Sequence, residues 1–262
     1  MSATNYAFGF TNGTLTIGQA LLTASADNKG RTYGQTKPVF TASYSGFVNG
    51  DTTSVLSGSP SLSTAATTNS PVGLYDIDVS QGTLGATNYT FVFTNGTLTI
   101  GQALLMVNAD NKSRAYGAGN PTLTASYTGF VNGETLTNSG VSGNPALSTT
   151  ATNSSPAGNY PIDVAQGTLN SSNYLFGFDN GTLTVVEVQP QILAVEGAGT
   201  PSVSITWSAV SNVTYRVQYE SDLNSGAWSD LTPDVTATGA TASATDNVAG
   251  GPARFYRIFI VP

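Results

Sequence analysis

Apolar and polar residues alternate over short stretches throughout this chain. In the range Tyr75–Val79 every second residue is apolar and the residues between are aspartates, and residues 88–93 (Asn-Tyr-Thr-Phe-Val-Phe) alternate in a similar way. The range Tyr160–Val164 keeps the pattern of Tyr75–Val79 in part. A period of two places alternate side chains on opposite faces of a strand, so these stretches predict half-buried β-strands and an all-β protein.

An Asn-Gly pair follows the alternating stretch 88–93 and precedes the apolar residues Leu98 and Ile100. The same pair recurs at Asn12-Gly13 and at Asn180-Gly181. Asn-Gly is the strongest short-range signal for a type I′ β-hairpin, because both central residues need a positive φ. We therefore expect a hairpin at each of the three positions.

One segment has the residues of a short helix. Residues 47–56 (Phe-Val-Asn-Gly-Asp-Thr-Thr-Ser-Val-Leu) carry Asn49 and Asp51, both good N-cap residues. We expect a short helix here, whereas the corresponding residues 130–141 are less helical.

The chain contains two near copies of one sequence, residues 20–100 and residues 103–185. Fixed-period similarity of this kind indicates an array of structural units. Residues 3–17 also match residues 86–100 almost letter for letter. We expect residues 1–19 to be the remnant strand pair of a truncated repeat, residues 20–102 and 103–188 to be two β repeats, and the chain to be the C-terminal part of a longer array.

Residues 189–262 differ from the repeats and contain both tryptophans. Val203, Ile205 and Trp207 alternate on one expected strand, with Trp207 in the core. Residues 215–220 (Tyr-Arg-Val-Gln-Tyr-Glu) alternate on the next, with Tyr215, Val217 and Tyr219 on one face and Arg216, Gln218 and Glu220 on the other. A tryptophan strand followed by Tyr-x-Val-x-Tyr resembles a fibronectin type III-like sandwich, in which Arg254–Ile260 would be the penultimate strand with no further strand after it.

The repeats themselves resemble a known family. The motif order is Ala-Asp-Asn-Lys-x-Arg-x-Tyr-Gly, then Thr-Ala-Ser-Tyr-x-Gly-Phe-Val-Asn-Gly, then Ser-Pro-x-Gly-x-Tyr, then Asn-Tyr-x-Phe and Asn-Gly-Thr-Leu-Thr. It resembles the MBG repeats of the YGX type, which occur in tandem in large bacterial extracellular and adhesin-like proteins. Tyr33-Gly34 and Tyr116-Gly117 stand where that family has its Tyr-Gly pair. The resemblance implies an extracellular, non-catalytic module, and it leaves an immunoglobulin-like sandwich and a β-grasp-like fold open.

The composition excludes several functions. Only 9% of the residues are charged, the formal net charge is −7, and there are eight Lys and Arg residues. Nucleic acids and anionic membrane surfaces need clustered cations, so neither is an expected partner. The absence of Cys and His removes disulfides, thiolate chemistry and the commonest metal ligand. No apolar run approaches the roughly 20 residues of a spanning helix, and Met1–Thr4 does not begin a signal peptide. We expect no cofactor.

Trp228 is the candidate ligand-binding residue. It lies in residues 224–230 (Asn-Ser-Gly-Ala-Trp-Ser-Asp), a polar segment rich in turn residues. An exposed indole ring can stack on a sugar ring, since it joins an apolar face to a polar edge. The alternative is that Trp228 covers the core of its module from a loop.

The repeats contain two further candidate sites. Asp76 and Asp78 could hold Ca²⁺ through their oxygens, but Pro161 replaces the first of them in the second copy, so a solvated strand face is the preferred interpretation. Lys29 follows Asp27-Asn28 and could form an intramolecular isopeptide bond with Asp78 or Asn88, whereas a simple turn explains the same residues.

Catalysis would need a carboxylate pair from a small set of aspartates in the C-terminal module. Glycosidases place two carboxyl groups at a defined separation in a cleft. A module of this size offers little room for a cleft, so we expect no enzymatic activity and no catalytic residue. The set is Asp222, Asp230, Asp234 and Asp246.

The sequence therefore predicts a non-catalytic protein of the bacterial cell surface, a stalk or adhesin whose tandem β repeats present a terminal β module. Two alternatives stay open: a glycan-binding protein acting through residues 189–262, and a fibre subunit that assembles by strand addition. The expected partners are a surface polysaccharide or another surface protein. The chain is expected to be a monomer, with head-to-tail assembly as the other option.

Overall fold

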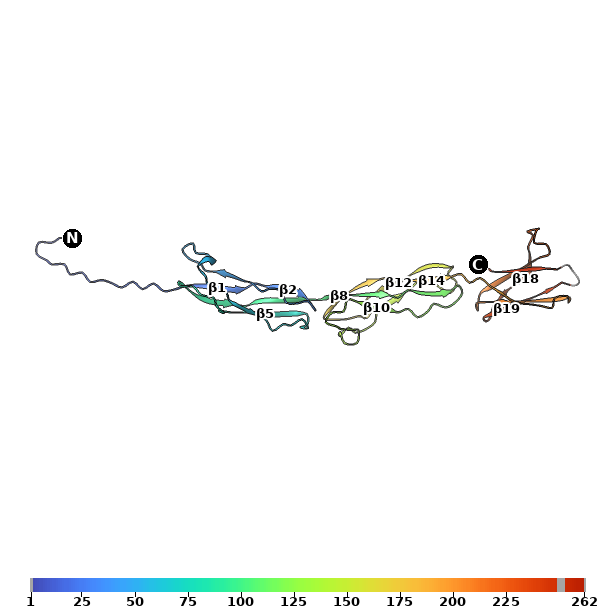
Figure 1. The fold of residues 1–262 in the computed structure, drawn as a ribbon, viewed down its shortest axis with the longest axis horizontal. Coiled ribbons are helices and arrows are strands. Elements are labelled where there is room, and N and C mark those ends of the chain that lie inside the picture. The colour runs from blue at the N-terminus through green and yellow to red at the C-terminus, as the bar shows by residue number, and fades with distance from the viewer. Residues whose placement is uncertain (1, 249–252, 262) are drawn as a thin grey trace. The chain divides into compact units, whose positions relative to one another are not determined.

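The computed structural model describes residues 2–248 and 253–261, which form β-structure almost throughout (Figure 1). They divide into two compact units. Unit 1 comprises Met1–Leu104, Phe130–Val141 and Ser171–Leu175, and unit 2 comprises Leu105–Gly129, Ser142–Asn170 and Phe176–Pro262. The alternation of apolar and polar residues thus predicted the all-β class correctly.

The first repeat forms two sheets, in the strand orders β3-β1-β6 and β2-β7-β5-β4. Its first strands pair in parallel with its last strands. Leu22 of β1 lies opposite Phe91 of β6, and Arg31 of β2 lies opposite Ile100 of β7. The strands are β1 (Ala20–Ala26), β2 (Lys29–Thr32), β3 (Ala42–Ser45), β4 (Ser61–Ser63), β5 (Gly73–Ser80), β6 (Tyr89–Thr94) and β7 (Gly96–Gly101).

The second repeat has the same topology, with sheets in the orders β10-β8-β13 and β11-β12-β14-β9. Its strand β14 pairs in parallel with β9, as β7 does with β2. The strands are β8 (Ala103–Ala109), β9 (Lys112–Ala115), β10 (Ala125–Thr128), β11 (Ala146–Ser148), β12 (Gly158–Ala165), β13 (Tyr174–Asp179) and β14 (Gly181–Val186).

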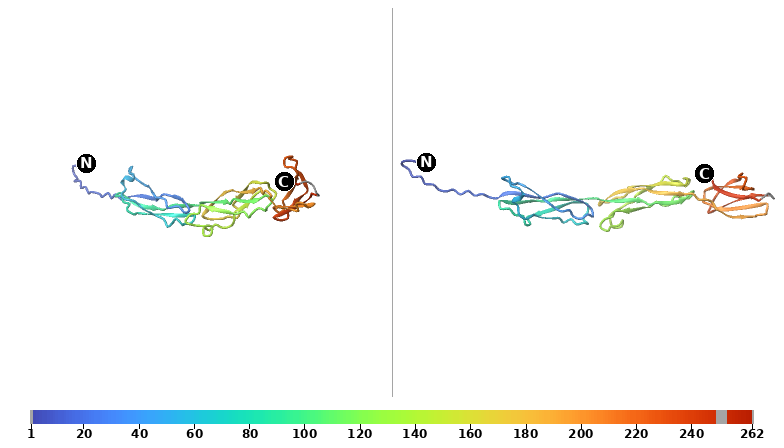
Figure 2. Two further views of the ribbon diagram at one scale, coloured as in Figure 1. Left: turned by 45° about the vertical axis from the view of Figure 1, so that its right-hand side comes forward. Right: turned by 45° about the horizontal axis from the view of Figure 1, so that its top comes forward.

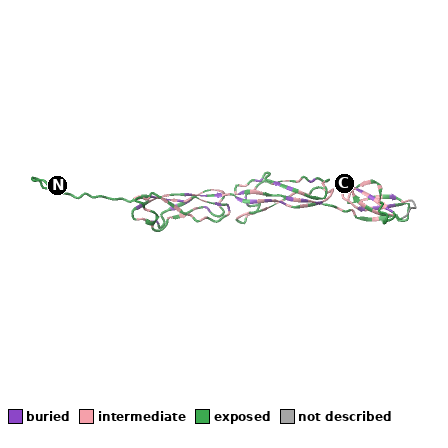
Figure 3. Ribbon diagram, turned by 90° about the horizontal axis from the view of Figure 1, so that it is seen from above, coloured by how far each residue is buried: buried purple, intermediate pink, exposed green. Residues whose placement is uncertain are grey.

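Buried residues alternate along these strands (Figure 3). In β5, Ile77 and Val79 are buried while Asp76 and Asp78 are exposed, as the sequence pattern predicts. Two sheets without an α-helix in the described residues correspond to the sandwich alternative, since a β-grasp fold needs a helix across its sheet. The core between them is made by side chains such as Leu22, Ile77 and Leu98.

The expected Asn-Gly hairpins are absent. Strands β6 and β7 belong to different sheets, so the chain passes from one sheet to the other at Asn95. Gly96 has no positive φ. Its Cβ would lie 2.5 Å from the carbonyl oxygen of Ala26, so the position needs glycine because another backbone approaches closely. Asn95 contributes through its side chain, which accepts a hydrogen bond from the Val79 N–H at 3.1 Å.

Residues 2–19 form no strand, contrary to the expected strand pair at 3–17 (Figure 2). Tyr6, Phe10, Leu15 and Ile17 are all exposed. The physical reason lies in the partners: β6 pairs with β1, and β7 pairs with β2 and β5. The matching residues have no such partners among the described residues, and a strand needs a partner for its backbone hydrogen bonds.

The expected short helix is a single 3₁₀ turn, η1 (Thr53–Val55). Its N-cap is Thr52, whose hydroxyl accepts from the Ser54 N–H, rather than Asn49 or Asp51. Asn49 instead adopts a positive φ of 58° in the preceding turn.

The C-terminal module consists of two antiparallel three-stranded sheets, β15-β16-β19 and β18-β17-β20. Trp207, Tyr215 and Val217 lie in its buried core, as predicted. Glu220 departs from the expected polar face, because it is buried and accepts a hydrogen bond from the Ala227 N–H at 2.9 Å. The strands are β15 (Ile192–Glu196), β16 (Ser202–Ser208), β17 (Thr214–Glu220), β18 (Ser229–Thr236), β19 (Thr241–Asn247) and β20 (Phe255–Ile260).

Candidate functional site

Trp228 lies directly before β18 and is half-buried. The guanidinium carbon of Arg257 sits 4.3 Å from the centre of its ring, which is a cation–π contact. The buried core of the module is built by other residues, among them Trp207 and Tyr215. Trp228 is therefore a surface ring with a cation above it, and whether it binds a ligand stays a prediction.

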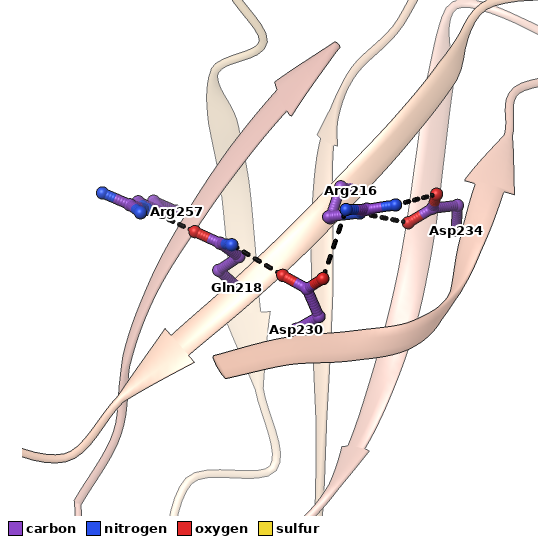
Figure 4. Close-up of polar contacts among 5 residues, drawn as sticks. All are labelled: Arg216, Gln218, Asp230, Asp234 and Arg257. Carbon is purple, nitrogen blue, oxygen red and sulfur yellow. Dashed lines mark hydrogen bonds and ion pairs between the residues drawn. The ribbon is translucent and has the colours of Figure 1, made fainter. Parts of the chain in front are cut away.

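A row of paired polar side chains extends from Arg257 across the outer face of β17, β18 and β20 (Figure 4). Arg257 Nε donates to Gln218 Oε1 at 2.8 Å, and Gln218 Nε2 donates to Asp230 Oδ1 at 2.6 Å. Arg216 then bridges two carboxylates, with Nη1 3.2 Å from Asp230 Oδ2 and Nη2 2.8 Å from Asp234 Oδ2. The row joins the three strands of the sheet.

Charge pairing acts on Arg216 and Asp234 of this row. The bidentate hydrogen bonds from Arg216 lower the pKa of Asp234, and Asp234 in turn raises the pKa of the Arg216 guanidinium. A carboxylate held in its ionised form by an arginine is a poor general acid. The arrangement fixes the sheet surface rather than preparing a proton transfer.

Asp246 and Arg254 form a second, more buried pair beside a hollow of the module. Arg254 Nη1 lies 2.6 Å from Asp246 Oδ2, and the Tyr256 hydroxyl donates to the same carboxylate at 3.0 Å. Burial and the neighbouring Asp246 raise the pKa of Tyr256 to about 12. The hollow has a volume of about 510 Å³, with Val203, Arg254 and Tyr256 among its walls.

Three of the four aspartates considered for catalysis are thus held by arginine. The fourth, Asp222, accepts a hydrogen bond from the Asn224 N–H at 3.0 Å within its own loop. The described residues contain no group of three or more His, Cys, Asp or Glu side chains placed to hold a metal ion.

Local hydrogen bonds engage two of the candidate residues in the first repeat, Asp78 and Asn28. Asp78 Oδ1 accepts from Asn95 Nδ2 at 2.8 Å, and Asp76 is an exposed residue of the same strand. Among the described residues no hydrogen bond or ion pair joins Lys29 to Asp78 or Asn88, so a simple turn stays the preferred interpretation over an isopeptide bond. Asn28 accepts from the Thr97 N–H at 2.7 Å, which accounts for its place in the motif.

The Tyr-Gly pairs carry contacts that the sequence did not predict. Within unit 1, the Tyr33 hydroxyl donates to Glu134 Oε1 at 2.6 Å, and its ring meets the ring of Tyr174 edge-on at 5.7 Å. Burial is the main cause of the raised pKa of Tyr33, followed by the hydrogen bond to Glu134. Gly34 has a φ of +80°, and a Cβ at this position would lie 2.5 Å from Val131. Tyr33-Gly34 of the first repeat is therefore fitted to residues of the second.

The second Tyr-Gly pair makes an analogous contact within unit 2. Gly117 has a φ of +78°, and a Cβ there would lie 2.1 Å from Val213 Cγ2. The Tyr116 side chain packs against the core cluster of the C-terminal module that contains Trp207. Because glycine has no Cβ, the valine side chain of the following module can pack directly against the backbone at each of these positions. Each Tyr-Gly pair is therefore a contact between one module and the next. Such a contact joins residues about 100 positions apart, which no local pattern reveals.

Among the described residues there is no helix both long and apolar enough to cross a membrane. No curated protein matches the chain. The family model of the MBG domain (YGX type) matches two stretches, residues 22–99 and residues 105–184, which together make up more than half of the chain. These are the two repeats with their Tyr-Gly contacts and their common topology. The chain belongs to the MBG domain family of the YGX type.

Proposed function

We propose that this chain is part of a non-catalytic repeat protein of the bacterial cell surface, in which the MBG repeats are spacers that bear tension. The observation that supports this role is the parallel pairing of the first and last strands of each repeat. Ala20 lies opposite Tyr89, and Thr32 lies opposite Gly101. The points where the chain enters and leaves the first repeat are therefore at its opposite ends.

This topology determines how the repeat resists a pulling force. A force applied through Ala20 and Gly101 acts along β1 and β7, so it loads the ladders to β6 and β2 in shear. All hydrogen bonds of a sheared ladder resist together, whereas a ladder pulled from one end opens one bond at a time. The low charge of the chain fits a spacer that interacts weakly with its surroundings.

The test is to unfold single molecules by force in two pulling directions. The chain has no cysteine, so introduced cysteines give unique attachment points. One pair of attachments replaces Gln19 and Gln102, which shears the parallel ladders. The other replaces Leu74 and Thr99, which are direct partners in the antiparallel β5–β7 ladder, so that ladder opens from one end. The repeat length of about 80 residues corresponds to a contour of roughly 27 nm when stretched.

We expect the shearing direction to need a clearly higher force than the opening direction. Equal forces in the two directions would contradict a tension-bearing role and leave only a passive spacer. Neither pair of attachments loads the second repeat, so each trace reports the unfolding of the first repeat alone.

The C-terminal module is proposed to be a fibronectin type III-like sandwich presented by the spacer. Two facing three-stranded antiparallel sheets around Trp207 support this, with β20 as an outer strand of one sheet. The proposed partner is a surface polysaccharide or another surface protein.

A glycan-binding role through residues 189–262 is the second candidate, because Trp228 keeps part of its ring exposed beside Arg257. Saturable binding of the full chain to a polysaccharide, lost in Trp228→Ala and kept in a variant with the exposed Leu223→Ala change, would favour it. Absence of binding to a broad polysaccharide panel would remove it.

A further inference from the structure

The contact between the two repeats within unit 1 has three parts. Gly34 lies against a valine, the Tyr33 hydroxyl donates to a glutamate at 2.6 Å, and the Val72 N–H donates to an asparagine side chain at 3.1 Å. The three receiving residues of the second repeat are Val131, Glu134 and Asn173.

The first repeat carries a valine, an acidic residue and an asparagine at the equivalent positions, and we call Val48, Asp51 and Asn88 the acceptor surface. Its geometry is already built. The Tyr89 hydroxyl donates to Asp51 Oδ2 at 2.7 Å and accepts from the Val48 N–H at 3.0 Å. In the second repeat, Tyr174 makes the same two bonds at 2.5 and 3.1 Å.

The acceptor surface differs from its counterpart in being uncovered. Val48 is 45% exposed. Among the described residues, Asp51 Oδ1 and the side chain of Asn88 have no hydrogen-bond partner, whereas the equivalent Glu134 Oε1 and Asn173 receive Tyr33 and Val72. An oriented carboxylate, an amide and an apolar side chain are thus presented together.

We propose that the acceptor surface binds a further MBG repeat joined in tandem ahead of Gln19, through that repeat's Tyr-Gly turn and its Ser-Pro-x-Gly turn. The chain's own Tyr-Gly turns are already engaged, so they cannot supply the contact. Residues 3–19 match residues 86–102, the end of the repeat that supplies Tyr33 to the second repeat. Gln19 Nε2 also donates to Thr87 O at 2.9 Å, as Gln102 Nε2 does to the equivalent Ser172 O at 3.4 Å.

The length of the Asp51 side chain determines how closely an incoming tyrosine must approach the acceptor surface. Asp51 is one methylene shorter than Glu134, so the incoming tyrosine must approach more closely to reach the carboxylate. A repeat can be received here without bearing tension, so this proposal and the tension-bearing role can fail independently.

The experiment extends the full chain by placing a copy of residues 20–85 directly ahead of Ala3. Residues 3–17 then supply the last two strands of a complete repeat, and Gly18-Gln19 supply the connection found at Gly101-Gln102. Hydrogen exchange is followed at the Val48 and Asp51 amides, with the equivalent amides of Val131 and Glu134 as reference. We expect exchange at the first pair to slow by roughly tenfold, the effect of an added hydrogen bond to a charged group.

Two variants decide the outcome. Gly34→Val in the added copy alone should abolish most of the protection. Asp51→Asn should also abolish most of it when the extended and unextended chains both carry the change, a comparison that cancels its effect on the bond from the Tyr89 hydroxyl. A folded extension that leaves exchange at Val48 and Asp51 unchanged overturns the proposal.

A second measurement needs no extension. Glu134→Asp in the unextended chain converts the occupied surface into the chemistry of the acceptor surface. We expect the Tyr33 ring to keep its contact with Tyr174, seen as a retained nuclear Overhauser effect between the two rings. Release of Tyr33 in this variant would show that the shorter carboxylate cannot hold the turn, and it would overturn the proposal even if the added residues failed to fold.

Discussion

Both repeats bury an equivalent arginine, but they differ in the hydrogen-bond partner of its Nε. This difference gives a quantitative prediction. Arg31 and Arg114 are equivalent and are both buried. The Nε of Arg114 donates to Asn120 Oδ1 at 2.7 Å, whereas the Nε of Arg31 is buried without a partner among the described residues. The first repeat has Lys37 where the second has Asn120. We expect Lys37→Asn to stabilise the first repeat.

The magnitude follows from what the asparagine adds. An unpaired buried donor costs about 1–3 kcal/mol. Asn120 supplies that partner and also donates through Nδ2 to Ala151 O at 2.7 Å. The change removes only an exposed bond from Lys37 Nζ to Thr64 O at 3.3 Å, which is worth little. A net gain of about 1–2 kcal/mol is expected.

The assay is native-state hydrogen exchange, because it reports the two repeats separately in one molecule. A gain of about 1–2 kcal/mol slows the exchange of slowly exchanging amides such as Leu22 by roughly 5- to 30-fold. The equivalent Leu105 should not change. The reciprocal Asn120→Lys change should speed exchange at Leu105 and leave Leu22 as it is. If Lys37→Asn leaves the exchange of Leu22 unaltered, the unpaired Nε does not carry the cost assigned to it, and the reasoning is refuted.

Three other predictions concern single positions. Burial and Glu134 raise the pKa of Tyr174 from 10.0 to about 12, so the folded state favours the neutral phenol. The contribution of Tyr174 to folding stability is therefore complete below pH 10 and is lost between pH 10 and 12. The ionisation of Tyr174 is measured as the difference in absorbance at 295 nm between the protein and Tyr174→Phe. Gly96→Ala should cost at least about 2 kcal/mol in chemical denaturation, because its Cβ meets the Ala26 carbonyl, whereas Gly101→Ala, with open space around its Cβ, should be neutral or stabilise by up to about 1 kcal/mol. Trp228→Ala should lower stability by only about 0.5–1 kcal/mol, the worth of an exposed cation–π contact; a loss above about 3 kcal/mol would mean that the ring supports the core.

Patterns within one strand were readable from the sequence. The alternation at Tyr75–Val79 predicted β5 and its buried face, and the alternation of Val203, Ile205 and Trp207 predicted β16 and its core side. These positions follow from a period of two and from burial, which are properties of the strand itself.

Features that depend on residues far away in the sequence could not be predicted. The Asn95-Gly96 pair has the residues of a hairpin turn, yet glycine is needed there because the Ala26 backbone, about 70 positions earlier, approaches it closely. Residues 3–17 have the sequence of two strands but lack the partners that would make them strands. The alternation predicts Glu220 on the polar face. Its burial could not be predicted from the strand, because it depends on the hydrogen bond that Glu220 accepts from Ala227 in the following loop.

The parallel pairing of β1 with β6 also has a consequence for how the protein is made. Ala26 and Tyr89 are separated by about 60 residues, so a repeat emerging from the ribosome cannot close its sandwich until its last strands have been synthesised. Strand β13 of the second repeat shares the tyrosine and both phenylalanines of β6, so once it has been synthesised it can compete for β1. Exchange of strands between neighbours is a characteristic failure of repeat proteins with similar sequences. Synthesis in order from the N-terminus guards against it, because the first repeat can complete its ladder before the competing strand exists, and refolding of the finished chain from denaturant has no such order.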